Sequence, residues 1–162
     1  MAALSATEPS TSSASGRPGF VQWARSILFL GVPKSSPMWF RVAIILAMVV
    51  GAATVGASGA IHLHLWFAGY RHVPRIGPLF LAQSISAFVL APTIVLSRRT
   101  FAVLAGAGFQ VVSVVGLLLS ATVGFLGIHD GLDVPWASTS IILELIGFVV
   151  LATCGCALVA RR

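Results

Sequence analysis

The sequence is poor in charged residues, and this scarcity excludes most classes of soluble protein. Only four of the 162 residues are acidic, and 9% are charged in total. An average soluble domain carries about 25% charged residues. The basic residues outnumber the acidic ones and give a formal net charge of +6, and all but Lys34 are arginines. So few charges do not cover the surface of a globular protein in water, so we expect another solvent around most of the chain.

Recognisable catalytic motifs are missing as well. The chain has no Gly-rich phosphate loop, no carboxylate pair at catalytic spacing, no serine in a nucleophile elbow and no zinc-type spacing. Its two cysteines, Cys154 and Cys156, would face different directions on a helix, which is poor geometry for a disulfide. The sequence therefore favours a protein that is not an enzyme, and no motif predicts a cofactor.

What the sequence does contain is long apolar runs. Hydrophobic residues make up 57% of the chain, and the mean hydropathy is +1.00. Four runs cover residues 42–61, 76–97, 101–128 and 134–160, and Glu144 is the only charged residue inside them. A hydrocarbon core of ~30 Å needs roughly 20 helical residues, and the alternating strands of a β-barrel are absent. The sequence predicts an all-α polytopic membrane protein with four transmembrane helices.

The basic residues predict how these helices are oriented. Arg71 and Arg75 lie between the first and second runs, on one side of the membrane. The other eight basic residues precede the first run, follow the second or follow the fourth, and are therefore predicted on the opposite side: Arg17, Arg25, Lys34, Arg41, Arg98, Arg99, Arg161 and Arg162. Cytoplasmic segments carry the excess of basic residues, so both termini are predicted to be cytoplasmic. Short connections predict an antiparallel bundle. The sequence pI of 11.2 thus reflects membrane orientation, not nucleic-acid binding. Nine arginines against one lysine indicate a GC-rich genome, which favours a bacterial plasma membrane.

The chain before the first run divides into two parts. Residues 1–19 are rich in Ser, Thr, Ala and Pro, which predicts a disordered cytoplasmic tail. Residues 20–36 carry apolar side chains at helical spacing, which predicts an amphipathic segment lying in the membrane interface. Residues 37–162 form the predicted transmembrane domain.

Glu144 is the first candidate for a functional residue. With Ser58, Gln83 and Ser120 it is predicted to form a polar layer in the outer half of the bundle. A charged carboxylate in the membrane is costly, so we expect Glu144 to face the interior and to be protonated or hydrogen-bonded. It could be a proton or cation site, or a counter-charge for a ligand. The alternative is polar glue between helices, bonded to Gln83 or a serine.

A second group of candidates lies at the predicted outer surface. His62, His64, His129 and Asp130 are residue types that bind metal ions, and imidazole also binds haem iron. His62 and His64 would point the same way only on an extended segment, because they diverge by about 200° on a helix. The alternative is that these histidines lie in the membrane interface as part of an aromatic belt, with Trp66, Tyr70 and Trp136 as anchors.

The first outer loop also resembles a known group. The stretches that carry this resemblance are His62-Leu63, Gly69-Tyr70-Arg71 and Ile76-Gly77-Pro78-Leu79-Phe80-Leu81, together with Val123-Gly124-Phe125-Leu126-Gly127. They are similar to small actinobacterial four-span integral membrane proteins of uncharacterised function, over residues 51–160. The resemblance implies the four-helix topology and implies no reaction.

These observations favour a non-enzymatic interaction or accessory subunit in the membrane. Small residues such as Ala52, Gly56 and Ala60 share one helix face and let helices approach closely. The expected partners are the lipid bilayer and a membrane protein or a second copy of the chain. Two alternatives remain open: an outward-facing metal- or haem-binding protein, and a proton-coupled carrier or channel that uses Glu144.

Overall fold

The computed structural model describes residues 20–32, 35–124 and 135–161. The predicted tail at 1–19 lies outside these ranges, as do His129 and Asp130. The described chain consists of helices: α1 (Phe20–Leu28), α2 (Met38–Ala68), a short 3₁₀ helix η1 (Tyr70–His72), α3 (Ile76–Ser97), α4 (Thr100–Thr122) and α5 (Ala137–Ala160).

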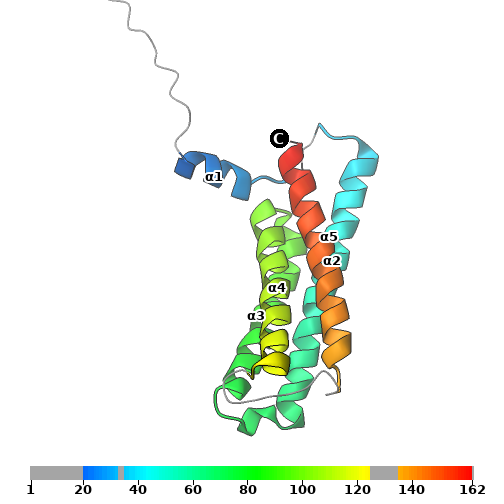
Figure 1. The fold of residues 1–162 in the computed structure, drawn as a ribbon. Coiled ribbons are helices and arrows are strands. Elements are labelled where there is room, and N and C mark those ends of the chain that lie inside the picture. Colours follow the sequence, from blue (N-terminus) through cyan, green and yellow to red (C-terminus); the bar gives the residue numbers. More distant parts are fainter. Residues whose placement is uncertain (1–19, 33–34, 125–134, 162) are drawn as a thin grey trace, which may run out of the picture.

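Four of these helices, α2 to α5, are long and apolar enough to cross a membrane. Figure 1 shows them side by side, with the shorter α1 lying across one end. This arrangement confirms the predicted all-helical protein with four candidate membrane spans. Helix α3 has the predicted limits of 76–97.

The first span is longer than the predicted 42–61. Helix α2 has 31 residues and would be about 46 Å long at 1.5 Å per residue, more than a hydrocarbon core of ~30 Å needs. It begins directly after Pro37 and ends before Gly69, whose φ of 145° is not helical. The intervening sequence contains no proline, so the helix continues through the histidines at its far end.

The last two spans also differ from their predicted limits. Helix α4 ends at Thr122, and Gly124 follows with a φ of 80°; residues 125–128 lie outside the described ranges. Helix α5 begins at Ala137 instead of 134, because Trp136 adopts a left-handed conformation with a φ of 73°. Hydropathy alone does not show such backbone turns.

The outer surface of the helices differs from that of a water-soluble protein. Large apolar side chains cover the outside, for example Leu96 at 80% and Ile142 at 60% exposure. Lipid tails are as apolar as leucine, so these exposed faces suit a bilayer. Inside, an apolar core that includes Met48, Val55 and Leu151 surrounds a smaller set of buried polar side chains: Ser58, Ser84, Thr100, Gln110, Ser113, Ser140 and Glu144.

Small residues set the closest helix contacts, at positions that differ in part from the predicted face. A Cβ added to Gly59 would lie 2.5 Å from the Cβ of Ala87, and one added to Gly51 would overlap Leu151. Gly56 has ordinary contact distance to Ala91, and Ala60 is exposed. The contact face of α2 therefore follows Gly51 and Gly59, because these residues face α5 and α3.

Four parts of the chain meet at one end of the long helices (Figure 1): α1, the α3–α4 turn, the start of α2 and the end of α5. The Thr100 amide donates a hydrogen bond to the Leu30 carbonyl over 2.9 Å, which joins the segment after α1 to the start of α4. The guanidinium of Arg161 lies 4.1 Å from the ring centroid of Phe40, which joins α5 to α2.

Candidate functional site: a cavity beside Glu144

Glu144 is fully buried, and hydroxyl groups from three helices converge on it. Its Oε1 accepts hydrogen bonds from Ser58 on α2 over 2.7 Å, from Ser113 on α4 over 2.5 Å and from Ser140 on α5 over 2.9 Å. Ser140 precedes Glu144 by four residues, so the two share one face of α5. The carboxyl group therefore ties three of the four long helices together.

The second carboxyl oxygen is in a different situation. Oε2 of Glu144 is buried and has no hydrogen-bond partner among residues 20–32, 35–124 and 135–161. A buried polar atom without a partner costs about 1–3 kcal/mol, and more when the group is charged. One oxygen thus accepts three hydrogen bonds from the protein, while the other accepts none from the described chain.

A cavity of about 420 Å³ adjoins Glu144. Its volume lies within the range of roughly 300–1,000 Å³ that is typical of small-molecule sites. Residues of α3 and α4 supply more than half of its lining, and most of them are apolar, including Leu79, Phe80, Val112 and Val115. Such a wall suits the apolar part of a ligand.

A few polar groups interrupt this apolar wall. Besides Glu144, Ser113 and Ser140, the cavity is lined by His62, Tyr70, Gln83 and Ser120. The Nε2 of Gln83 is buried and, in the described part of the chain, has no hydrogen-bond partner. Two residues that line the cavity therefore each carry a buried polar atom without a partner in the described chain: an acceptor on Glu144 and a donor on Gln83.

The four residues of the predicted polar layer have different roles in the structure, and three of them line the cavity. Ser58 donates directly to Glu144, whereas Gln83 and Ser120 line the cavity and make no hydrogen bond to Glu144 within the described chain. Sequence reasoning did not place Ser113 or Ser140 in this layer. The four-residue spacing of Ser140 and Glu144 was an available signal; the approach of Ser113 depends on helix packing.

The two histidines of α2 point toward different elements. Because α2 continues to Ala68, the extended segment that a His62–His64 pair requires is not formed. His62 donates from Nδ1 to the Ser58 carbonyl over 2.8 Å and packs on Phe80, whereas His64 packs on Trp136 at 5.9 Å between ring centroids.

The described chain does not contain a set of side chains that could bind the predicted metal ion. No three His, Cys, Asp or Glu side chains there lie close enough to hold a metal ion together. Since His129 and Asp130 lie outside the described residues, the hypothesis stays a prediction.

The three predicted aromatic anchors lie near the same end. Tyr70 and Trp136 line the cavity, and Tyr70 packs on Phe80 with 5.0 Å between ring centroids. Trp66 packs on the adjacent Phe67. Two of the three are therefore part of the cavity wall.

These features define a class: a multi-pass membrane protein with a ligand-sized cavity at a buried carboxyl group. Comparisons with protein-family models, with curated proteins and with solved structures find no match to this chain. The resemblance to small actinobacterial four-span proteins therefore stays a prediction, and the function is argued from the cavity itself.

Proposed function

We propose that this protein binds a small lipophilic molecule within the membrane and recognises its cationic or hydrogen-bond-donating head group through Glu144. The observation that carries the proposal is the unpaired Oε2 of this buried residue beside a cavity of about 420 Å³. A protonated amine is the best match, because it provides both hydrogen-bond donors and a compensating charge.

The cavity wall narrows the class of ligand further. The apolar side chains of α3 and α4 favour an aliphatic or aromatic body. The unpaired Nε2 of Gln83 favours a hydrogen-bond acceptor elsewhere on the same molecule. An amphiphilic amine with one acceptor group satisfies all three features.

Hydrogen bonding between helices explains the contacts of Oε1 of Glu144 but not the unpaired Oε2. Gln110 offers a comparison, because its Nε2 donates to Thr54 over 3.2 Å and its Oε1 also has no partner in the described chain. Gln110, however, does not line the cavity. An unpaired atom alone therefore does not indicate a site; Glu144, unlike Gln110, also lines a cavity of ligand size.

We further propose that the helices form an antiparallel bundle in a bacterial plasma membrane with both termini in the cytoplasm. Support comes from the arginines: Arg25, Arg41, Arg98, Arg99 and Arg161 belong to elements that meet at one end, and only Arg71 and Arg75 follow the far end of α2. The excess of basic residues marks the cytoplasmic side. In this orientation the cavity lies in the outer half of the membrane.

Three probes of equal chain length test the proposal: n-octylamine, n-octanol and n-octanoate. We expect octylamine to raise the thermal stability of the detergent-purified protein, because a ligand that binds only the folded state stabilises it. Octanol, which offers one hydrogen-bond donor but no charge, should have a smaller effect, and the anionic octanoate should have little effect. The Glu144→Gln variant keeps the shape of the side chain but cannot carry a negative charge, so it should lose the response to octylamine.

The matched control is Gln110→Met, which removes a buried polar group that does not line the cavity. This variant should respond to octylamine as the wild type does. A response to octylamine that is the same in wild type and Glu144→Gln, or equal responses to all three probes, would contradict the proposal.

A further inference from the structure

The second unexplained feature is the surface at the opposite end of the helices, formed by α1 and the α3–α4 turn. This surface is defined by Arg25, Arg98 and Arg99, with the apolar residues Val21 and Trp23 of α1. It shares no residue with the Glu144 cavity.

Helix α1 is attached to the bundle at its C-terminal side. Thr100 donates from both its amide and its hydroxyl group to the Leu30 carbonyl, over 2.9 and 3.1 Å. Gly31 pairs with Arg99 in an isolated β-bridge, and the Arg99 guanidinium lies 5.4 Å from the ring centroid of Phe29. These contacts hold the end of α1 against the turn between α3 and α4.

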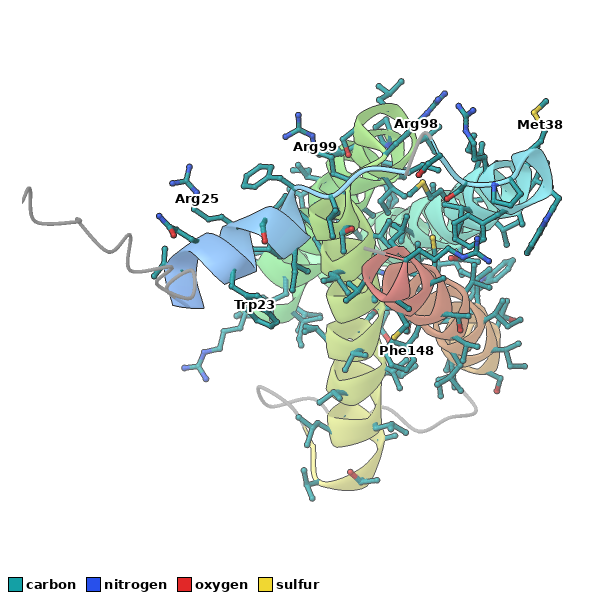
Figure 2. All side chains as sticks on the ribbon, turned by 90° about the horizontal axis from the view of Figure 1, so that it is seen from above. Trp23, Arg25, Met38, Arg98, Arg99 and Phe148 are labelled. Atoms are coloured by element: carbon teal, nitrogen blue, oxygen red, sulfur yellow. The ribbon has the colours of Figure 1, made fainter. Side chains whose placement is uncertain are left out.

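From this attachment α1 extends away from the other helices. Figure 1 shows it lying across the end of the bundle, and Figure 2 shows it projecting sideways when seen from above. Val21 is 69% and Trp23 is 47% exposed. A helix at the end of membrane spans, lying across their direction with exposed apolar side chains, has the position of an interfacial helix.

The charges on this surface decide which kind of interface it suits. Arg25, Arg98 and Arg99 are all exposed, and Figure 2 shows them along one edge of this end. Glu144 is the one acidic side chain in the described chain, and it is buried at the cavity. None of the three guanidinium groups therefore has a carboxylate of the described chain as its counter-ion.

We propose that this surface binds the head group of an anionic phospholipid. Arginine forms paired hydrogen bonds with phosphate oxygens, and basic residues at a membrane surface attract anionic lipids. The apolar residues of α1 would enter the acyl-chain boundary while the arginines hold the phosphate. The lipid head group, not a free phosphate ion, explains both halves of the surface.

The experiment uses the full chain in lipid nanodiscs with Trp23 as the reporter. Trp39, Trp66 and Trp136 are replaced by Phe, which leaves Trp23 as the only tryptophan. Its fluorescence is measured with a minor fraction of brominated phosphatidylglycerol or, separately, brominated phosphatidylcholine in a phosphatidylcholine background. We expect stronger quenching by the anionic lipid, because it should accumulate around α1.

The arginines are then tested against a matched pair at the other end of the molecule. Arg25→Gln, Arg98→Gln and Arg99→Gln should each lower the relative association of phosphatidylglycerol by roughly fivefold. The control Arg71→Gln/Arg75→Gln, which removes two exposed arginines from the far end, should leave quenching unchanged. Inorganic phosphate in the buffer should not reduce it.

Several results would overturn the proposal. Equal quenching of Trp23 by the two lipids in the wild-type arginine background would do so without any arginine variant, so the test does not depend on how those variants fold. Unchanged preference after all three Arg→Gln substitutions would also contradict it. Displacement by inorganic phosphate would assign the arginines to a free anion instead.

Discussion

At the scale of single residues, the two oxygens of Glu144 have separate roles. Oε1 accepts hydrogen bonds from three serine hydroxyl groups on three helices, while Oε2 has no partner in the described chain. The first oxygen contributes to the stability of the bundle, and the second is the proposed contact for a ligand. Substitutions at this residue can therefore separate folding from binding.

Replacing Glu144 with Gln should change stability little, by about 1 kcal/mol or less, because the amide oxygen still accepts hydroxyl hydrogen bonds. Replacing it with Leu should destabilise the protein by about 1–3 kcal/mol, because three buried serines lose their acceptor. Thermal unfolding in detergent measures both. Similar stability of the Gln and Leu variants would show that the serine bonds contribute nothing.

Gly147 shows how a single missing methyl group permits a polar contact between helices. A Cβ at this position would overlap both Gln110 Nε2 and Thr54 Oγ1, which form a hydrogen bond to each other. We expect Gly147→Ala to destabilise the protein by about 1–3 kcal/mol, as overpacking of a core does. Gly108 has no atom within 4 Å of a Cβ, so Gly108→Ala is the control without loss of stability. Equal melting temperatures of the two variants would rule out this packing role.

At the scale of secondary-structure elements, the cavity depends on what α4 presents to α3. The cavity-lining part of α4 includes Gly116, which has no side chain, and Ser120, whose side chain is small, so both leave space beside the larger residues of α3. The Gly116 position has no atom within 4 Å of a Cβ. A Cβ therefore has free space at this position, and we expect a larger side chain to take up cavity volume.

Gly116→Leu should therefore weaken the octylamine response at least tenfold while the protein stays folded, because the added side chain would occupy the proposed binding volume. Its control is Gly108→Leu on the same helix, at a position that also has free space but does not line the cavity. The measurement is a titration of thermal stability against octylamine. Undiminished affinity in Gly116→Leu would place the amine somewhere else.

At the scale of the whole molecule, the distribution of arginines predicts which end faces the cytoplasm. Cysteines introduced at Ser35 and at His72 would lie on opposite sides of the membrane if both termini are cytoplasmic. In a background with Cys154→Ala and Cys156→Ala, a membrane-impermeant maleimide should label His72→Cys in intact cells. Ser35→Cys should react only after the membrane is opened. The reverse pattern would invert the proposed orientation and place the cavity in the inner half of the membrane.

The whole-molecule view also changes which function is favoured. Small-residue faces and missing catalytic motifs can be seen in the sequence, and they favoured an interaction or accessory subunit. The cavity requires the relative placement of α3, α4 and α5, which one-dimensional patterns do not contain. Binding of a lipophilic amine is now the proposal because it accounts for both unpaired atoms, on Glu144 and on Gln83.

The sequence by itself determined the helical class, the presence of four candidate spans and the burial of Glu144. Each of these follows from local physics: run length against bilayer thickness, and the cost of a carboxyl group in lipid. The sequence predicted Ser58 in the same layer as Glu144 only because the two residues lie at a similar depth in the membrane. Only the tertiary structure decided that Ser113 and Ser140 share Oε1, that α2 continues through both histidines, and that a cavity opens beside Gln83. Depth along a helix can be counted from the sequence, whereas rotation about its axis and the distance to its neighbours are set by side-chain packing.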